Sequence, residues 1–188
     1  IMEKYNIEYF LYIGGNDSMD TIKMLSDYAA KKDKPQKFMG VPKTIDNDLP
    51  LTDHTPGYGS AAKYIATSMK EIIRDNASFG ASKPTVCVVE IMGRHAGWLT
   101  AASALSRDSD CEGPDLIYLP EVPFDLDSFM EKVKHLAETK RSVVIAVSEG
   151  VRLADGRFVC ELGNMSDYVD AFGHKQLSGC ASFLTNKI

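Results

Sequence analysis

The sequence predicts a layered α/β protein with mainly parallel strands. Short apolar runs rich in β-branched residues alternate with longer segments of helical periodicity, in the order β, α, β, α, β, α, β, α, β. Glycine, proline and polar clusters punctuate the alternation. Because ligands of such folds bind at the carboxyl ends of the strands, the polar clusters that follow the strands are the first candidates for a functional site.

Each segment has its own signal. Short apolar runs bounded by turn residues predict the strands, and apolar residues three and four positions apart predict the helices. Gly14-Gly15 ends the first strand in a tight turn, and Asp17 or Ser18 can cap the helix that follows. The expected strands are 9–13, 37–41, 85–91, 115–119 and 143–148, and the expected helices run from that cap to about 32 and over 57–76, 97–106 and 126–139.

Composition narrows the class of protein. The 188 residues are 44% hydrophobic and 25% charged, an ordinary globular balance. A net charge of -5 argues against nucleic-acid and membrane-surface partners, because such binding needs a basic face. The four widely spaced cysteines favour reduced thiols in a cytoplasmic protein. No stretch has the length of a membrane helix or the layout of a signal peptide, and the opening residues suggest an interior piece of a longer chain.

The first polar cluster is GGNDS, at residues 14–18. Glycines before a helix let an anion approach the backbone, and the amino end of the helix offers N–H groups to it. A plain strand-to-helix turn capped by Asp17 has the same sequence, so both interpretations stand on these residues alone.

The second cluster is PKTIDND, at residues 42–48. Asp46 and Asp48 are two residues apart and can reach different sides of one locus, so one can accept a proton from a hydroxyl while the other holds a magnesium ion. Lys43 beside them suits a polyanionic transition state. A solvated turn with a surface ion pair is the alternative interpretation.

Two further clusters follow the third and last strands. Arg94 in Met92-Gly93-Arg94 can bind a phosphate through its planar fork, while Gly93 allows close approach to the backbone; a helix cap is the alternative. Glu149 ends an apolar strand, where it can accept hydrogen bonds from sugar hydroxyls or cap a turn. His174 and Lys175 offer two more donors, and the residues expected to be structural are His54, His95 and Trp98.

Taken together and in order, these clusters resemble the motifs of the phosphofructokinase family, most closely those of its pyrophosphate-dependent members. The joint match extends over nearly the whole chain and is specific, although each motif alone would mean little. The matching motifs are GGNDS at 14–18, PKTIDND at 42–48, PGYGSAAKYIA at 56–66, MGRHAGW at 92–98, PEVPF at 120–124, SEG at 148–150 and FGHKQ at 172–176.

The resemblance implies two Rossmann-like, three-layer α/β/α domains with mainly parallel sheets, one of them only partly present. Residues 1–57 would belong to the phosphate-donor domain for pyrophosphate or a nucleotide. Residues 58–175 would form the fructose 6-phosphate domain, and residues 176–188 would return to the first domain. The resemblance also implies a homodimer or higher homo-oligomer. The family's first Gly-rich phosphate loop is absent from this sequence, so the segment alone would lack part of the donor site.

The activity implied by the resemblance is magnesium-dependent phosphoryl transfer from pyrophosphate to fructose 6-phosphate. Asp46 falls on the family's proton acceptor, and Asp48 on a residue that assists the metal. Asn16 replaces the usual metal-binding aspartate, which lowers the charge at that position. The residues implied to contact substrate are Gly15, Thr44, Ile45, Asp46, Met92, Gly93, Arg94, Glu149, His174 and Lys175.

Two positions bear on the phosphate donor. ATP-using members of the family have glycine where this chain has Asp17 and Lys43. A carboxylate at the first position would repel the α-phosphate of a nucleotide, and a lysine at the second would stabilise the leaving phosphate. Pyrophosphate is therefore the preferred donor. The alternatives are an ATP-dependent 6-phosphofructokinase and a non-catalytic regulatory subunit that binds sugar phosphate.

Overall fold

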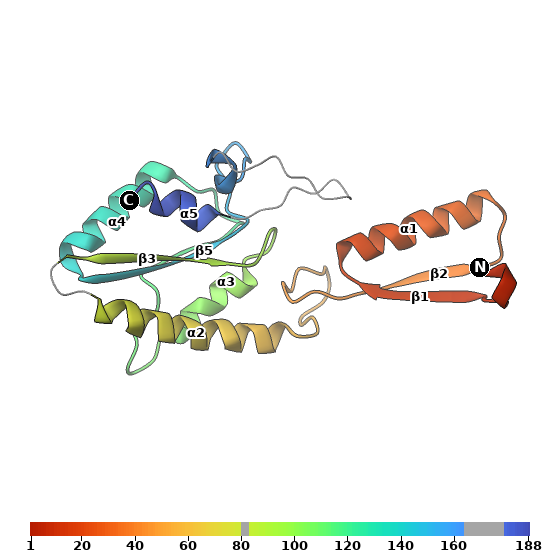
Figure 1. Cartoon of the computed structure of the whole chain (residues 1–188), viewed down its shortest axis with the longest axis horizontal. Helices are drawn as coiled ribbons and strands as arrows, with labels where there is room; N and C mark the ends of the chain where they lie inside the picture. The colour runs from red at the N-terminus through yellow and green to blue at the C-terminus, as the bar shows by residue number, and fades with distance from the viewer. Residues whose placement is uncertain (80–82, 164–178) are drawn as a thin grey trace. The chain divides into compact units, whose positions relative to one another are not determined.

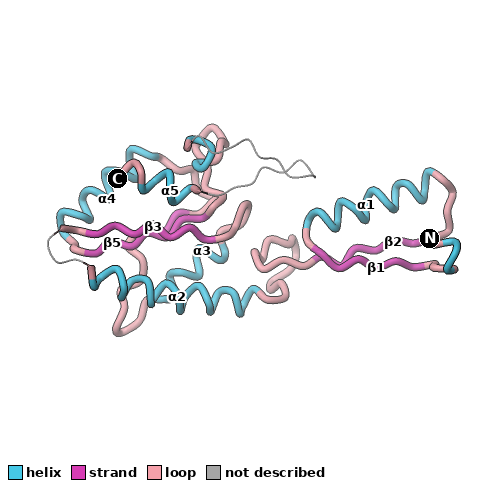
Figure 2. The backbone as a smooth tube through the Cα atoms, viewed as in Figure 1, coloured by secondary structure: helices cyan, strands magenta, loops and turns pink. Residues whose placement is uncertain are grey.

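The computed structural model describes residues 1–79, 83–163 and 179–188. The chain divides into two compact units, an amino-terminal unit over Ile1–Ile45 and a carboxyl-terminal unit over Asp46–Ile188. Each unit has its own parallel sheet, and the strands and helices of each can be followed in Figure 1 and Figure 2. The boundary between the units falls inside the PKTIDND motif.

The amino-terminal unit is one βαβ element preceded by a 3₁₀ turn over Glu3–Tyr5. β1 (Tyr9–Gly14) and β2 (Lys37–Pro42) pair in parallel, and α1 (Asn16–Lys31) connects them and packs on both. The apolar side chains of α1 recur at helical spacing, and the buried ones are Ile22 and Ala29. The predicted strand–helix–strand order of this unit is confirmed.

The start of α1 differs from the prediction. Gly15 is the N-cap, with extended backbone angles and no side-chain cap, whereas Asp17 and Ser18 lie in the first helical turn. Gly14 packs closely on the first turn of the helix, because a Cβ atom on it would lie 2.0 Å from the Ser18 hydroxyl. The expectation of an Asp17 or Ser18 cap is therefore wrong, and glycine at 14 serves close helix–strand approach.

The carboxyl-terminal unit is a three-stranded parallel sheet in the order β3-β5-β4, with helices on both faces (Figure 1). The central strand β5 is buried along nearly its whole length, which explains its continuous apolar sequence. The expected three-layer α/β/α arrangement is confirmed for this unit. Its elements are α2 (Tyr58–Ser78), β3 (Thr85–Ile91), α3 (Trp98–Ala102), β4 (Leu116–Tyr118), α4 (Leu126–Thr139), β5 (Ser142–Ser148) and α5 (Cys180–Thr185), with 3₁₀ turns over Ser103–Ser106 and Val159–Leu162.

Alternate residues of β5 face two different cores. Val143 and Ile145 belong to a cluster with α4 and α5 that includes the fully buried Phe129. Val144 and Ala146 belong to the opposite cluster, with Met69 of α2. This alternation follows from the two-residue period of a strand and fixes its register firmly, since a slip of one residue would exchange the two faces.

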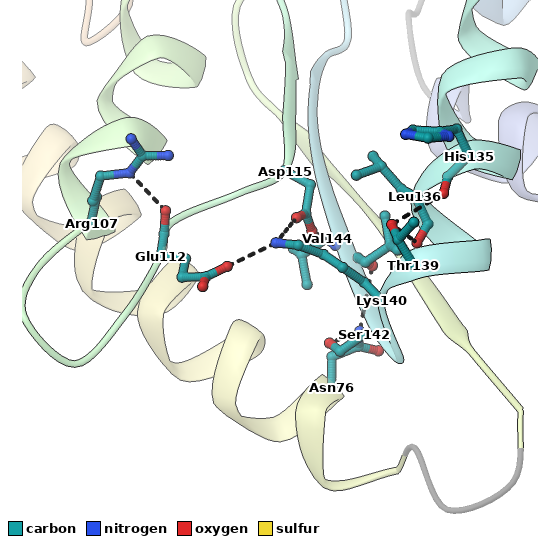
Figure 3. Close-up of polar contacts among 11 residues, drawn as sticks. Asn76, Arg107, Glu112, Asp115, His135, Leu136, Thr139, Lys140, Ser142 and Val144 are labelled. Carbon is teal, nitrogen blue, oxygen red and sulfur yellow. Dashed lines mark hydrogen bonds and ion pairs between the residues drawn. The ribbon is translucent and has the colours of Figure 1, made fainter.

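Polar contacts fix the amino end of this sheet (Figure 3). The carboxylate of Asp115 accepts hydrogen bonds from the Val144 backbone N–H and from Lys140 Nζ, both at 2.8 Å. Asn76 of α2 donates to the Ser142 hydroxyl at 2.7 Å. These contacts join the loop before β4, the start of β5 and the end of α2. The amino edge of the sheet is therefore a structural edge, opposite the strand ends that carry the predicted site.

The predicted element boundaries agree closely with the structure for β3 and α4. The helix expected over 97–106 is instead a short α-helix, α3, that continues as a 3₁₀ turn. The sequence reasoning did not identify α5. In the described parts of the chain, no helix is long and apolar enough to cross a membrane.

The boundary between the compact units falls between Ile45 and Asp46. The domain limits implied by the resemblance, 1–57, 58–175 and 176–188, stay predictions. The segment from Gly179 onward packs within the carboxyl-terminal unit, because the Glu90 carboxylate of β3 accepts hydrogen bonds from the backbone N–H groups of Gly179 (3.2 Å) and Ala181 (2.9 Å). α5 then lies against β3 and β5.

Candidate functional site

In the amino-terminal unit, the predicted site residues meet at the carboxyl ends of β1 and β2. The Lys43 backbone N–H donates to the Gly14 carbonyl at 2.9 Å, which extends the parallel pairing past Pro42. α1 starts two residues after Gly14, so its amino end lies at the same edge. The structure thus brings the Lys43 backbone beside the turn that leads into the helix.

This edge has the chemistry of an anion site. The first N–H groups of a helix have no partner inside the helix, and its dipole favours negative charge there. Gly15 leaves space beside the Lys43 carbonyl, since a Cβ atom on it would meet nothing closer than 3.9 Å. The Lys43 side chain is exposed, and Asp17 is half-buried in the first turn. The arrangement can accept a small polyanion, with Lys43 as its cation.

In the carboxyl-terminal unit, the loops after β3 and β5 are joined by hydrogen bonds. The Gly93 backbone N–H donates to Glu149 Oε1 at 3.2 Å, and the buried Ser148 hydroxyl donates to the Gly93 carbonyl at 2.5 Å. Gly93 has a φ of +141°, which an L side chain rarely adopts. A Cβ atom on Gly150 would lie 2.0 Å from the Arg94 carbonyl, so the two loops are in backbone contact.

The electrostatics of Glu149 show which charges surround it. Burial raises the pKa of this carboxyl above its ordinary value, and the charges of Asp46 and Glu90 raise it further. The Gly93 N–H and the Arg94 guanidinium act in the opposite direction. The charges of Asp46 and Arg94 thus act on Glu149, which lies at the carboxyl end of β5.

Asp46 and Asp48 lie near a second group on this edge, His95. Burial and the charges of Arg152 and Arg94 lower the pKa of His95, while the carboxylates of Asp48 and Asp46 oppose that shift. Both carboxylates are half-buried. The shared effect on His95 is consistent with the prediction that Asp46 and Asp48 lie close to one another.

Sequence reasoning missed Arg152. Its guanidinium contacts His95 Nδ1 at 2.9 Å through Nη2 and lies over the Phe158 ring, 4.1 Å from the centroid. It thereby joins the loop after β5 to the loop that carries Arg94. The only sequence signal was its position three residues after Glu149, which is too weak to single out an arginine.

The other aromatic side chains expected to be structural pack against one another. The His54 ring stacks on Tyr58 with centroids 5.9 Å apart, and Tyr58 meets Trp98 edge to face at 6.4 Å. These contacts join the loop after residue 46 to α2 and α3. They support the interpretation of His54 and Trp98 as packing residues.

Some predicted site residues are not connected by the structure. His174 and Lys175 lie outside the described residues. Asn16 and Asp48, the expected metal ligands, belong to different compact units. Within the described ranges, no group of three or more His, Cys, Asp or Glu side chains is placed to hold a metal ion. The remaining substrate-contact predictions, Thr44, Ile45 and Met92, lie on the same two sets of strand ends.

Replacing Glu149 with glutamine is expected to raise the free energy of unfolding at neutral pH. A carboxyl whose pKa is raised on folding stabilises the fold below its unfolded pKa, and that contribution is lost as pH rises through the folded pKa. Ionised Glu149 therefore carries a desolvation cost that glutamine avoids, while the amide oxygen still accepts from Gly93.

Denaturant unfolding across the range from about pH 4 to about pH 7 would measure the difference. The advantage of the variant should shrink toward the acid end, where Glu149 is protonated. Glu131→Gln on the exposed face of α4 is the matched control and should show no such trend. A glutamine variant that is less stable at neutral pH would contradict the prediction.

Comparison with known proteins gives a consistent assignment. The phosphofructokinase family profile matches residues 1–186. A protein of Halomonas elongata named pyrophosphate--fructose 6-phosphate 1-phosphotransferase is 45% identical over 188 residues, covering 100% of this chain and 44% of the relative. A protein of Xanthomonas campestris with the same name is 44% identical over the same coverage. The chain thus spans under half the length of these curated relatives.

Solved structures agree with the sequence relatives. A crystal structure of a pyrophosphate-dependent phosphofructokinase from Nitrosospira multiformis superposes with a TM-score of 0.69 and 43% sequence identity, covering 83% of this chain and 40% of that one. The family profile covers all but the last two residues of the sequence, including every motif quoted above. The chain belongs to the phosphofructokinase family.

Proposed function

We propose that the natural protein containing this chain transfers a phosphoryl group from pyrophosphate to the 1-hydroxyl of fructose 6-phosphate. The products are fructose 1,6-bisphosphate and phosphate, and the reaction is reversible. The observation that carries the proposal is the junction of the loops after β3 and β5, where the Gly93 N–H donates to Glu149 Oε1 at 3.2 Å and Gly150 packs on the Arg94 carbonyl, with the charge of Asp46 acting on Glu149. The names of the relatives support this choice of substrates.

In this proposal Asp46 is the proton acceptor. The 1-hydroxyl oxygen of the sugar attacks the terminal phosphorus of pyrophosphate, so a new P–O bond forms and the bond to the bridging oxygen breaks. The hydroxyl proton passes to the Asp46 carboxylate, and phosphate leaves. General-base assistance of this kind contributes about 10²- to 10⁴-fold to the rate.

The sugar phosphate is held by groups at the carboxyl ends of β3 and β5. Arg94 binds the phosphate or the transferring group, and Glu149 accepts hydrogen bonds from sugar hydroxyls. The loop contacts among Gly93, Ser148 and Gly150 support this role, because they hold both side chains on fixed backbone. The other residues proposed to contact substrate are Gly15, Thr44, Ile45, Met92, His174 and Lys175.

Two domains have separate roles in this proposal. Residues 1–57 belong to the phosphate-donor domain, residues 58–175 form the fructose 6-phosphate domain, and residues 176–188 return to the first. The anion-binding edge at the start of α1 supports the first assignment. The position of Glu149 and Arg94 supports the second.

Pyrophosphate is the proposed donor because of two side chains in the amino-terminal unit. Lys43 offers a charge-assisted contact to the leaving phosphate, which strengthens as negative charge develops on it. Asp17, at the amino end of α1, disfavours the additional phosphate of a nucleotide through like-charge repulsion. Both side chains lie at the strand-end edge described above.

Mg²⁺ is the proposed metal, with Asp48 and Asn16 as its protein ligands. A single carboxylate and an amide do not form a complete protein cage, but Mg²⁺ usually keeps several waters and is completed by substrate phosphates. The donor set therefore fits a metal that arrives with pyrophosphate. When bound, Mg²⁺ neutralises charge on the phosphates. We also propose a cytoplasmic homodimer or higher homo-oligomer.

The test is an assay of the complete natural protein with fructose 6-phosphate and Mg²⁺, using pyrophosphate and ATP in parallel. We expect rapid formation of fructose 1,6-bisphosphate with pyrophosphate and little or none with ATP. ATP use without pyrophosphate use would overturn the donor assignment. Binding of fructose 6-phosphate without turnover of either donor would instead indicate a regulatory subunit.

A further inference from the structure

We infer that Asn47 is a positioning residue, which holds the loop over residues 46–55 so that Asp46 and Asp48 are presented to the site. The inference rests on the proposed role of Asp46 as proton acceptor. Asn47 lies between the two aspartates, and the sequence alone assigned it no role. Its backbone conformation, its burial and its two hydrogen bonds all differ from those of a solvated turn residue.

The backbone at Asn47 is left-handed, with a φ of +59°. Asparagine tolerates this region better than most residues, because its short polar side chain can bond locally. The stretch from Asp46 to Asp48 is therefore not extended. The left-handed residue turns the chain between the two carboxylates, so their relative placement depends on this one position.

The side chain of Asn47 closes the loop. Its Nδ2 donates to the Asp53 carbonyl at 3.1 Å, and its Oδ1 accepts from the Thr55 backbone N–H at 2.9 Å. Asn47 is only 7% exposed and Thr55 only 3% exposed, so water cannot replace these bonds easily. One neutral side chain thus satisfies a donor and an acceptor across six to eight residues.

No other common side chain meets all of these needs. Aspartate keeps an acceptor for Thr55 but loses the donor to Asp53, and it adds a third negative charge between Asp46 and Asp48. Glycine accepts the left-handed backbone but makes neither hydrogen bond. These two substitutions therefore separate the backbone requirement, the hydrogen bonds and the charge.

The placement of Asp46 is what such a change would disturb. Its charge reaches Glu149 and His95, so it lies among the groups of the proposed site. A misplacement of about 1 Å in a catalytic group can cost about a hundredfold in rate. Asn47 acts only through its neighbours, so its loss should affect turnover more than substrate affinity.

The experiment compares N47G and N47D with the parent and with D46A, all in the complete natural protein with pyrophosphate and fructose 6-phosphate. We expect N47G to lower kcat about a hundredfold while the KM for fructose 6-phosphate changes little. N6G is the matched control, because Asn6 is also left-handed, with a φ of +55°, but exposed and outside the proposed site. It should keep the parental rate.

The split between kcat and KM distinguishes positioning from general loss of structure. N47D retains the acceptor for the Thr55 N–H but loses the donor to the Asp53 carbonyl, so we expect it to lower kcat while the KM for fructose 6-phosphate changes little. A parental kcat in N47D would overturn the inference. Should N47G not fold, N47D still decides, because it retains the bond to Thr55.

The rates of D46A and N47G also distinguish the positioning role of Asn47 from the proposed function of the protein. If D46A is inactive while N47G keeps the parental kcat, the positioning role fails and the proposed function stands. If D46A keeps the parental rate, the proposed role of Asp46 fails, and the inference about Asn47 fails with it. A low rate with a normal KM for fructose 6-phosphate in both N47G and N47D supports both proposals.

Discussion

Replacing Asp46 with alanine in the complete natural protein is expected to lower kcat for pyrophosphate-dependent phosphorylation by about 10²- to 10⁴-fold. The reason is that the variant has no group at this position to take the hydroxyl proton as the new P–O bond forms. Asp46 lies close enough to Glu149 and His95 for its charge to affect both pKa values, which places it inside the proposed site. The KM values for both substrates should change much less.

The matched control is Asp53→Ala, in the same loop. The Asp53 side chain is exposed, and its contact with Asn47 uses the backbone carbonyl, which alanine retains. Steady-state rates for the two variants, together with their thermal unfolding midpoints, separate loss of chemistry from loss of structure. Near-parental turnover by a folded D46A protein would remove Asp46 as the proton acceptor.

The strands and most helices could be predicted because their signals are local. Residues 85–91 and 126–139 match the observed β3 and α4, since a run rich in β-branched residues and a helix with an Asp125 cap carry their own boundaries. The position of the site followed from the same order, because parallel strands place the residues after them at one edge. Arg94 and Glu149 were found in this way.

Contacts between distant segments could not be predicted. Glu90 interrupts an apolar strand for a reason found 89 residues away, at the start of α5. A tertiary contact outweighs the local preference there, which is a weak prior. The start of α1 was also missed, because the helix begins after Gly15 although the sequence contains two better capping residues.

The roles of side chains that bond to distant backbone groups could not be predicted from the sequence either. Asn47 and Ser148 have ordinary sequence contexts, a polar turn and the end of a strand. Their roles depend on which carbonyl or N–H group lies opposite, namely Thr55 for Asn47 and Gly93 for Ser148. The sequence alone does not show which backbone group lies opposite each side chain.

Replacing Lys43 with methionine is expected to lower kcat with pyrophosphate by about 10²- to 10³-fold, the usual effect of removing one donor to a developing negative charge. Methionine keeps most of the length and apolar surface of lysine, so the loss would come from the ammonium group. The Lys43 backbone N–H, which bonds to Gly14, is unchanged by this substitution. The strand end should therefore keep its geometry.

Lys37→Met provides the control, because Lys37 is an exposed lysine at the other end of the same strand, β2. It should keep the parental rate with pyrophosphate, measured under the same conditions.

The double variant D17G/K43G then tests selectivity for the phosphate donor. It removes the carboxylate that opposes a nucleotide and the ammonium group that favours pyrophosphate. We expect the ratio of ATP to pyrophosphate activity to rise in that variant. If K43M keeps the parental rate, the leaving phosphate is stabilised by another group, and the argument for pyrophosphate from this lysine fails.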